Sequence, residues 1–355
     1  MDILLLKKVL NYFIVVFVIL NISLSCDELP EEVNISDLPD YYFENNYLDE
    51  RVKAINNAIE ECSDGCETFF WITDIHWEPN LNTRISPILI KYISTKTGID
   101  KVLNGGDTGS SQVICENAIS QLRKAIGSNK VYTVTGNHEM DDASRYESPY
   151  ERVSDELRCH NADIVYGDNN RTFFYFDNRE SKTRYIGLSS YGLFQGNNYI
   201  TGFTEEQLEW LKTIALKVDE NWTLLLFSHS LYYVDVVTDK LRVGQLEASD
   251  FIKVIDSYKG NGTIASVLMG HAHRDRIHIG PTGVPYIISA SDGYATHQGD
   301  INVTRVPGTI SEQHFEVVVI NKGKREVKLF SIGAPARDGF DDNQGNEVDL
   351  RIVNY

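Results

Sequence analysis

The chain has 355 residues, of which 42% are hydrophobic and 24% are charged, a composition typical of a globular protein with one large core. Its formal charge of −18 is strongly acidic, and no basic stripe interrupts the sequence, so nucleic acid is excluded as an expected partner. An acidic surface suits a protein that collects divalent cations.

The first 25 residues have the layout of a secretory signal peptide. Two lysines precede a short apolar run, Tyr12 to Leu20, and small residues at Ser23 and Ser25 precede Cys26. We therefore predict that residues 1–25 are removed and that the protein is extracytoplasmic and secreted. An uncleaved N-terminal membrane anchor is the alternative, and a lipidated Cys26 would also attach the chain to a membrane.

Cysteines and sequons are consistent with export. Cys62 and Cys66 flank Ser-Asp-Gly and are the disulfide pair that we favour, with metal ligation by the two thiols as the alternative. Cys115 and Cys159 could form a second bridge. In a eukaryotic secretory pathway the chain would be a glycoprotein, because Asn-x-Ser/Thr sequons lie at Asn34, Asn170, Asn221, Asn261 and Asn302.

Hydrophobic periodicity predicts one large domain over residues 61–335. Before it, residues 26–60 comprise an acidic lead-in, which we expect to be flexible, and a first amphipathic helix. Residues 336–355 are predicted as a C-terminal tail. Residues 140–170 are irregular and polar, and they form a candidate rim or lid of the domain.

The first half of the domain alternates strands with helices, which predicts a parallel sheet with polar loops at one edge. Its strands are expected at 68–73, 101–104 and 131–135, and its helices at 86–97 and 111–126. The second half is richer in strands, expected at 172–177, 184–189, 223–227, 264–268, 284–289, 315–320 and 326–331. Helices are expected over 208–218, opened by the capping box Thr204-Glu-Glu-Gln207, and over 248–258.

Metal-competent side chains stand where five of the predicted strands end. They are Asp74, His76, Asp107, Asn137, His138, His229, His271 and His273. Their nitrogen and oxygen atoms suit a borderline divalent metal, and the Asp-x-His and His-x-His spacings project both side chains of a pair in one direction. Gly136 allows a sharp turn out of its strand. Because the carboxyl ends of such strands meet at one edge, the pattern predicts a metal site there.

In chain order these segments resemble the signature of the calcineurin-like metallophosphoesterases: Asp74-x-His76, Gly106-Asp107, Gly136-Asn137-His138-Glu139, His229 and Gly270-His271-x-His273. The resemblance covers about residues 68–290. It implies an α/β fold, a metallophosphoesterase-type β-sandwich flanked by helices in four layers (α/β/β/α). It also implies two metal ions at the carboxyl ends of the strands.

The same resemblance implies a role for each residue. The first metal would be held by Asp74, His76 and His273. The second would be held by Asn137, His229 and His271, and Asp107 would bridge the two. His138 would be the catalytic acid, and Glu139 would orient its neighbours from outside the ligand set or begin a helix. The divalent ions would be zinc, manganese or iron.

Such a centre implies a metal-dependent phosphoric ester hydrolase. A hydroxide bridging the two ions would attack phosphorus in line, and His138 would protonate the leaving alkoxide. Extracytoplasmic phosphodiesterases and sphingomyelinase-like enzymes are both candidate relatives within the family. We expect a small-molecule or lipid phosphoester substrate, with a phosphodiester favoured over a monoester, and no obligate protein partner.

Two rival functions stay open. A metallophosphoesterase fold that has lost catalysis would be a binding protein, although such loss usually breaks the ligand set and every segment is intact here. A metal-storage protein would use closed, Cys-rich sites, and no cysteine lies in these segments. Trp77, Tyr191 and Tyr294 could line a substrate pocket or pack in the core. The other histidines have no supporting pattern and are predicted as surface or core residues: His160, His278, His297 and His314.

Overall fold

The computed structural model describes residues 32–62, 65–77, 84–140, 163–169, 172–191, 193–195, 198–200, 202–235, 240–243, 246–293, 297–298, 301–302, 306–334 and 349–355. Residues 33–355 form one compact unit by their contacts. Several predictions concern residues outside this described part: the signal peptide, Cys26, Cys159, His160, Asn170, Tyr294 and most of the candidate rim.

Two mixed sheets make up the centre of this unit. The first has the order β19-β18-β17-β1-β2-β3, and its strands are β1 (Cys66–Ile72), β2 (Val102–Asn104), β3 (Val131–Thr133), β17 (His314–Asn321), β18 (Glu326–Gly333) and β19 (Leu350–Asn354). The second has the order β13-β14-β12-β9-β6-β5-β4, and its strands are β4 (Val165–Tyr166), β5 (Phe174–Asn178), β6 (Thr183–Leu188), β9 (Thr223–Ser228), β12 (Thr263–Met269), β13 (Arg276–Ile279) and β14 (Pro285–Ile288). Strands β1, β2 and β3 are parallel, as the sequence predicts, whereas β17 joins β1 antiparallel.

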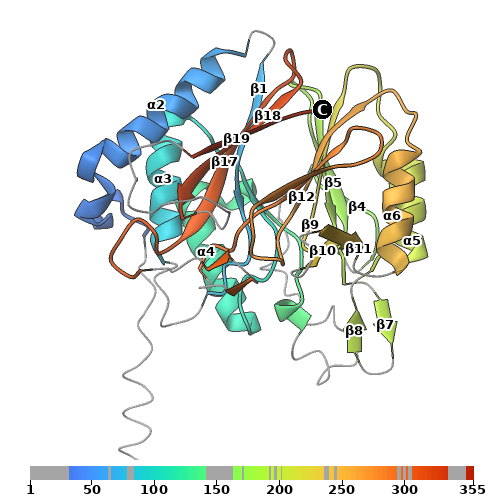
Figure 1. The fold of residues 1–355 in the computed structure, drawn as a ribbon, viewed down its shortest axis with the longest axis horizontal. Helices are drawn as coiled ribbons and strands as arrows, with labels where there is room; N and C mark the ends of the chain where they lie inside the picture. The colour runs from blue at the N-terminus through green and yellow to red at the C-terminus, as the bar shows by residue number, and fades with distance from the viewer. Residues whose placement is uncertain are drawn as a thin grey trace, which may run out of the picture. The chain divides into compact units, whose positions relative to one another are not determined.

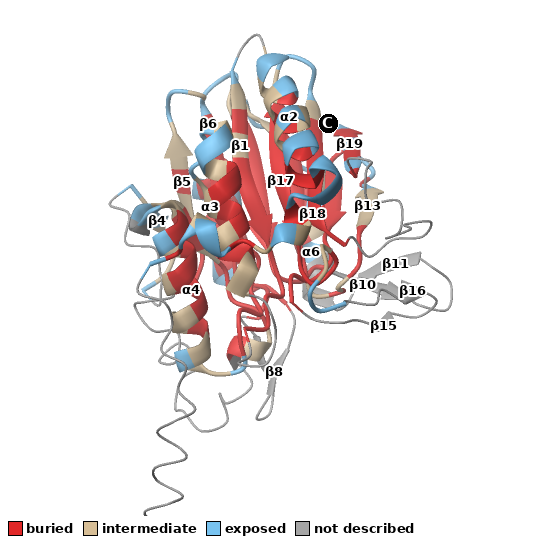
Figure 2. Cartoon of the chain, turned by 90° about the vertical axis from the view of Figure 1, so that its left-hand side faces the viewer, coloured by how far each residue is buried: buried red, intermediate tan, exposed pale blue. Residues whose placement is uncertain are grey.

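Helices cover the outer face of each sheet (Figure 1). The first sheet is flanked by α2 (Tyr47–Glu60), α3 (Ile85–Thr97) and α4 (Gln112–Ile126). The second is flanked by α5 (Glu205–Trp210), which continues as a π-helical turn (Leu211–Ala215), and by α6 (Leu246–Asp256). Figure 2 shows β17 and β18 almost wholly buried and the helices α2 and α3 exposed along one side. The predicted four-layer α/β/β/α sandwich is confirmed.

Strand β9 shows how the sequence specifies these layers. Its six residues are all buried, and successive side chains point to opposite faces of the sheet. Leu225 and Phe227 pack into the core between the two sheets, where they meet Trp71 of β1. Leu224 and Leu226 pack on the other side against residues of α5 and α6. A continuous apolar run is therefore needed here, because both faces of the strand are covered.

The structure differs from the sequence-based prediction at both flanks of the domain. Residues 33–46 were expected to be flexible, but they form three 3-10 turns, Ile35–Asp37, Asp40–Tyr42 and Glu44–Asn46. Val33 and Tyr42 are buried, so the expectation of flexibility is wrong for these residues. In the segment predicted as a C-terminal tail, β19 adds an edge strand to the first sheet.

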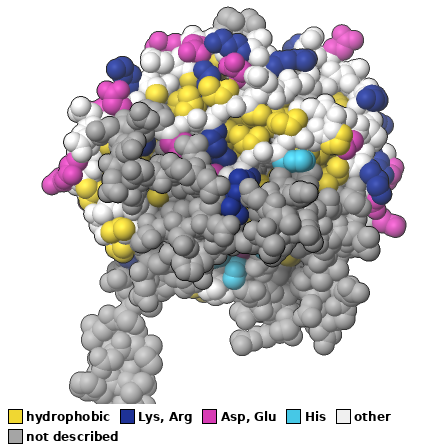
Figure 3. Space-filling model, in the orientation of Figure 1, with side chains coloured by type: hydrophobic (Ala, Val, Ile, Leu, Met, Phe, Trp, Pro, Cys, Tyr) yellow, Lys and Arg dark blue, Asp and Glu magenta, His cyan; other side chains and the backbone are white. Residues whose placement is uncertain are grey.

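Two further 3-10 turns, Ser128–Lys130 and His138–Met140, and three short hairpins complete the described secondary structure. Their strands are β7 (Leu193–Gln195), β8 (Asn198–Ile200), β10 (Tyr232–Asp235), β11 (Lys240–Val243), β15 (His297–Gln298) and β16 (Ile301–Asn302). Within the described residues, every helix is too short or too polar to cross a bilayer. On the face drawn in Figure 3, Lys and Arg side chains are interspersed with Asp and Glu.

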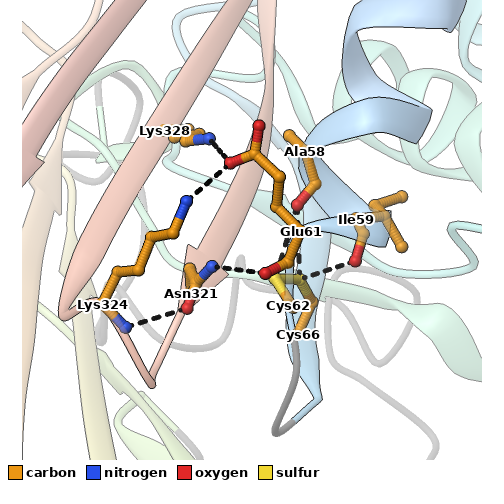
Figure 4. Close-up of a disulfide and its surroundings, with 8 residues drawn as sticks. All are labelled: Ala58, Ile59, Glu61, Cys62, Cys66, Asn321, Lys324 and Lys328. Carbon is orange, nitrogen blue, oxygen red and sulfur yellow. Dashed lines mark hydrogen bonds and ion pairs between the residues drawn. A yellow bond between two sulfur atoms is a disulfide. The ribbon is translucent and has the colours of Figure 1, made fainter.

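A disulfide between Cys62 and Cys66 joins the end of α2 to the start of β1, which confirms the favoured pairing (Figure 4). Next to it, the Glu61 carboxylate lies 2.9 Å from Lys324 Nζ and 2.8 Å from Lys328 Nζ. These contacts tie α2 to the β17–β18 hairpin. Cys115 is buried, and Cys159, with which it could form a second bridge, lies outside the described residues.

Candidate metal centre

Strands from both sheets deliver the predicted ligands to one edge of the sandwich. The loops that follow β1, β2 and β3 carry Asp74, His76, Asp107, Asn137 and His138, and the loops that follow β9 and β12 carry His229, His271 and His273. The site therefore straddles the two sheets. All eight predicted residues lie in the described part of the chain.

Backbone hydrogen bonds continue the β1–β2 pairing into the two loops that carry the first carboxylates. Asp74 N donates to Gly106 O at 2.9 Å, and His76 N donates to Asp107 O at 3.0 Å. Asp74, His76 and Asp107 have φ values of 50°, 46° and 51°, in the left-handed region that non-glycine residues rarely adopt. Such backbone occurs mainly at functional sites, where the surroundings hold it in place.

A first group of ligand atoms comes from Asp74, His76, Asp107 and His273, all within 4.8 Å of one another. His273 Nε2 lies 3.0 Å from Asp74 Oδ1 and 3.2 Å from His76 Nε2. Ligands that are each about 2.0–2.2 Å from one ion lie within roughly 4.4 Å of one another. The group therefore has close to the span that a single metal requires.

A second group comes from Asp107, His229 and His271, so Asp107 belongs to both. Asp107 Oδ2 lies 3.1 Å from His229 Nε2. On the other side of its ring, His229 Nδ1 donates to Gly105 O at 2.8 Å. A metal-ligating histidine usually makes this second bond to a carbonyl, which leaves the opposite nitrogen directed at the metal.

Tyr191 connects Asn137 to the two histidines of the second group. Tyr191 Oη lies 3.4 Å from Asn137 Oδ1, and its ring centroid is 5.8 Å from that of His229 and 6.2 Å from that of His271. From the sequence, Tyr191 could either pack in the core or line a substrate pocket. The structure brings it into contact with three predicted ligands, and only the tertiary fold could have revealed this.

His138 differs from the ligands in its exposure. Its side chain is 38% exposed, and its Nε2 lies 3.9 Å from Asp107 Oδ2. Its backbone N–H donates to Asp107 Oδ1 at 2.8 Å, which fixes the residue next to the shared carboxylate. The imidazole thus stands at the rim of a buried cluster and is partly accessible to solvent.

Charge and burial oppose each other throughout the cluster. Burial alone would raise the pKa of Asp74 and of Asp107, but the surrounding histidines outweigh it and hold both pKa values below the usual range. Burial lowers the pKa of His229 by itself, yet the carboxylates of Asp107 and Asp74 raise it to about 10. Burial lowers the pKa of His76 and of His271 to about 4.

These shifts leave two ionised carboxylates, neutral imidazoles at His76 and His271, and a protonated imidazole at His229 between the carboxylates, whose place as the positive partner a divalent ion would take. Buried negative charge of this kind requires a positive partner. Neutral imidazole nitrogens and carboxylate oxygens are also the ligands that zinc, manganese and iron accept. The residues present therefore fit divalent metal ions.

Glu139 stands outside both ligand groups and connects their loops. Its buried carboxylate accepts from the backbone N–H groups of Asp107 at 3.0 Å, Thr108 at 2.6 Å and Gly136 at 2.6 Å. Burial raises its pKa and so does the nearby Asp107, while the amides of Thr108 and Gly136 oppose the shift. Of the two roles considered for Glu139, these contacts fit that of a residue that orients its neighbours.

Two glycines allow the loops to approach the carboxylates closely. A Cβ on Gly136 would lie 2.2 Å from Asp107 Oδ1, and one on Gly270 would lie 2.2 Å from Asp74 Oδ2. Both distances are far below a van der Waals contact. The sequence predicted Gly136 for a sharp turn, and the structure adds a steric requirement, because any side chain at this position would collide with Asp107.

The other residues that the sequence singled out and the structure describes lie in the core or on strands. Trp77 is buried, and its backbone N–H donates to Thr108 O at 2.8 Å. His278 lies on β13, and His314 is buried beside Asp275. Cys115 Sγ approaches Glu139 Oε1 at 3.9 Å, a contact that no sequence pattern signalled.

The model of the calcineurin-like phosphoesterase family matches residues 68–275 of the chain. A search of curated proteins gives no match.

Among solved structures, a dimetal phosphatase from Danio rerio is 14% identical with a TM-score of 0.49, over 81% of this chain and 98% of that one. A phosphopantetheinyl hydrolase from Mycobacterium tuberculosis is 12% identical with a TM-score of 0.36, over 63% and 89%. A 5'-nucleotidase from Candida albicans is 12% identical with a TM-score of 0.40, over 80% and 50%.

Because Asp107 contributes to both ligand groups, replacing it by Asn should weaken metal binding at both. Asp107→Asn keeps the shape of the side chain and removes its charge. We expect a lower content of divalent metal in the purified protein, measured by elemental analysis, and an almost complete loss of phosphate-ester hydrolysis.

Asp177→Asn is the matched control, because Asp177 pairs with Arg184 at 2.7 Å on strands β5 and β6, away from the ligands. It should keep the metal content of the unaltered protein. Full metal occupancy and normal turnover in Asp107→Asn would contradict a shared carboxylate.

Proposed function

The chain belongs to the calcineurin-like phosphoesterase family and is a metal-dependent phosphoric ester hydrolase, and we propose that it is a dinuclear enzyme acting on small-molecule or lipid phosphodiesters. The observation that carries this proposal is the sharing of Asp107 between two ligand groups. A carboxylate has two oxygens and a full charge, so it suits a position between two cations.

In this proposal the chain's own residues divide the work. Asp74, His76 and His273 would hold one divalent ion, Asn137, His229 and His271 would hold the other, and Asp107 would serve both. Bound divalent ions would supply Lewis acidity for the phosphate oxygens and a water of lowered pKa. Tyr191 orients the Asn137 amide, and Glu139 fixes the loops that carry Asp107 and Asn137.

His138 is proposed as the general acid. A leaving alkoxide needs a proton, and a suitable donor must reach the substrate while staying close to the reacting centre. The exposed side chain of His138 and its contacts with Asp107 support this role. The formal charge of −18 supports a diester, because a diester carries one negative charge where a monoester dianion carries two.

Hydrolysis of chromogenic esters tests the proposed function. We expect the purified protein to hydrolyse bis(p-nitrophenyl) phosphate faster than p-nitrophenyl phosphate. The activity should disappear with EDTA and return with added Mn²⁺ or Zn²⁺. Metal binding without turnover of either ester would favour the alternative, an inactive binding protein of the same fold.

The role of His138 is tested with two leaving groups. His138→Ala should retain its metal and bind substrate about as well, while turnover of an alkyl ester falls by roughly 10²–10⁴-fold. The deficit should be smaller for a nitrophenyl ester, whose leaving group needs no proton. A loss of equal size on both esters that added metal reverses would instead identify His138 as a ligand.

Export is proposed from the N-terminal segment and supported by the Cys62–Cys66 disulfide, since disulfides persist in oxidising compartments. We expect mature protein recovered from a secreting host to begin at or near Cys26, as N-terminal sequencing would show. Retention of Met1 on a cytoplasmic, fully reduced protein would refute export.

A further inference from the structure

A second cluster of charged side chains is buried close to the candidate metal centre. Arg351 of β19 contacts the carboxylates of Asp275, at 3.2 Å, and of Glu316 on β17. His314 Nε2 lies 3.7 Å from the Asp275 carboxylate. The four side chains are between 0% and 8% exposed, so this is a charge cluster inside the protein.

Three members of this cluster are of metal-binding type. Ligand atoms of Asp275, His314 and Glu316 lie within 4.8 Å of one another. However, the guanidinium of Arg351 contacts both carboxylates and places a positive charge between them. The cluster is therefore better described as two acids bridged by an arginine than as a third metal site.

Stability alone does not explain such a cluster. Bringing two carboxylates and a guanidinium out of water is costly, and well-packed apolar residues in their place are often as stable or more so. The neighbouring side chains on the inner face of this sheet are apolar, including Val318 and Leu329. The position of Asp275 offers another explanation, because it follows the predicted ligand His273 by two residues.

The loop that carries His271 and His273 has a strained backbone. Their φ values are 65° and 51°, in the left-handed region that is unfavourable for non-glycine residues. Such a conformation persists only when the surroundings hold both ends of the loop. At its start, Gly270 N donates to His229 O at 3.0 Å and His271 N donates to Asp74 Oδ2 at 2.8 Å.

Asp275 provides the contacts at the other end of this loop. Its Oδ1 accepts from the backbone N–H of Ala290 at 3.0 Å and from Arg351. Arg351 Nη1 also donates to Ile288 O at 3.3 Å, and Glu316 Oε2 accepts from Ser289 Oγ at 2.8 Å. The cluster thus joins the end of the ligand loop to the segment after β14 and to the first sheet.

We propose that Arg351 is a positioning residue for the metal ligands His271 and His273, and that it acts through Asp275. The inference rests on the proposed dinuclear function and deepens it, because it makes the last strand of the chain part of the support of the metal centre. Removing the guanidinium leaves Asp275 and Glu316 facing each other without their cation. The downstream end of the loop then keeps the bond from Ala290 N–H to Asp275 but loses the contact with Arg351, and the two histidines are held less firmly in the orientation that a metal needs.

Binding of Mn²⁺ to the full chain tests this proposal directly. The metal-depleted protein is titrated with Mn²⁺ at a temperature where each variant is folded, as circular dichroism shows. Loss of residues that orient metal ligands typically costs 10–100-fold in affinity, so we expect the Kd of Arg351→Met to rise by about that factor. Arg351→Lys keeps the charge and should recover part of the affinity.

Arg184→Met is the matched control. Arg184 is also buried and pairs with Asp177. Its guanidinium donates to the carbonyl of Ala215 at 3.1 Å and not to the ligand loops. Its loss should lower the melting temperature and leave the Kd for Mn²⁺ unchanged. The comparison separates positioning of the metal ligands from a general loss of stability.

The other possible results of the Mn²⁺ titration also support or overturn the proposed role of Arg351. An unchanged Kd in Arg351→Met, with only a lower melting temperature, overturns the inference. If that variant does not fold, Asp275→Asn replaces it, since it removes the charge facing Arg351: a raised Kd supports the inference and an unchanged one overturns it. A third Mn²⁺ ion that is lost in Glu316→Gln would also overturn it. Failure of the unaltered protein to bind Mn²⁺ would overturn the proposed function itself.

Discussion

The three hydrogen bonds accepted by the Glu139 carboxylate are the interaction on which the rest of the site depends. They bind the loop after β2 to the loop after β3, through the backbone of Asp107, Thr108 and Gly136. Bonds from amides to an ionised carboxylate are stronger than neutral ones. One buried side chain therefore sets where the shared carboxylate of Asp107 lies relative to His138, and neither residue could take its position independently of the other.

Strain in the ligand loops explains why the scaffold must be rigid. Asp74, His76, Asp107, His271 and His273 all have positive φ values, so most of the predicted ligands lie on unfavourable backbone. The apolar core between the sheets offsets this cost, since it holds the ends of β1, β9 and β12 at one edge. Local conformation is least favourable where the chemistry is expected, which is a common property of functional sites.

Local patterns in the sequence predicted the buried strands and the metal-competent residues at their ends, whereas the sandwich and the role of each ligand were implied by the family resemblance. Each ligand follows a buried apolar run, as His229 follows β9, and the strand ends bring these residues together. The lead-in could not be predicted, because its structure comes from distant partners: Tyr41 contacts Glu312, and Tyr42 contacts Gln313. The roles of Tyr191 and Arg351 were missed for the same reason.

Among the described residues, three of the buried sets of carboxylates are stabilised by three different kinds of partner. Backbone amides surround Glu139, a guanidinium joins Asp275 to Glu316, and histidines surround Asp74 and Asp107. Backbone N–H groups and a guanidinium carry hydrogen-bond donors but no free electron pair, so they cannot bind a metal ion. Only the histidine set can accept a divalent ion with a coordination position left for water or a phosphate oxygen. Glu139 and the pair Asp275 and Glu316 are therefore suited to holding the loops in place, and Asp74 and Asp107 are suited to binding the metal ions that the reaction needs.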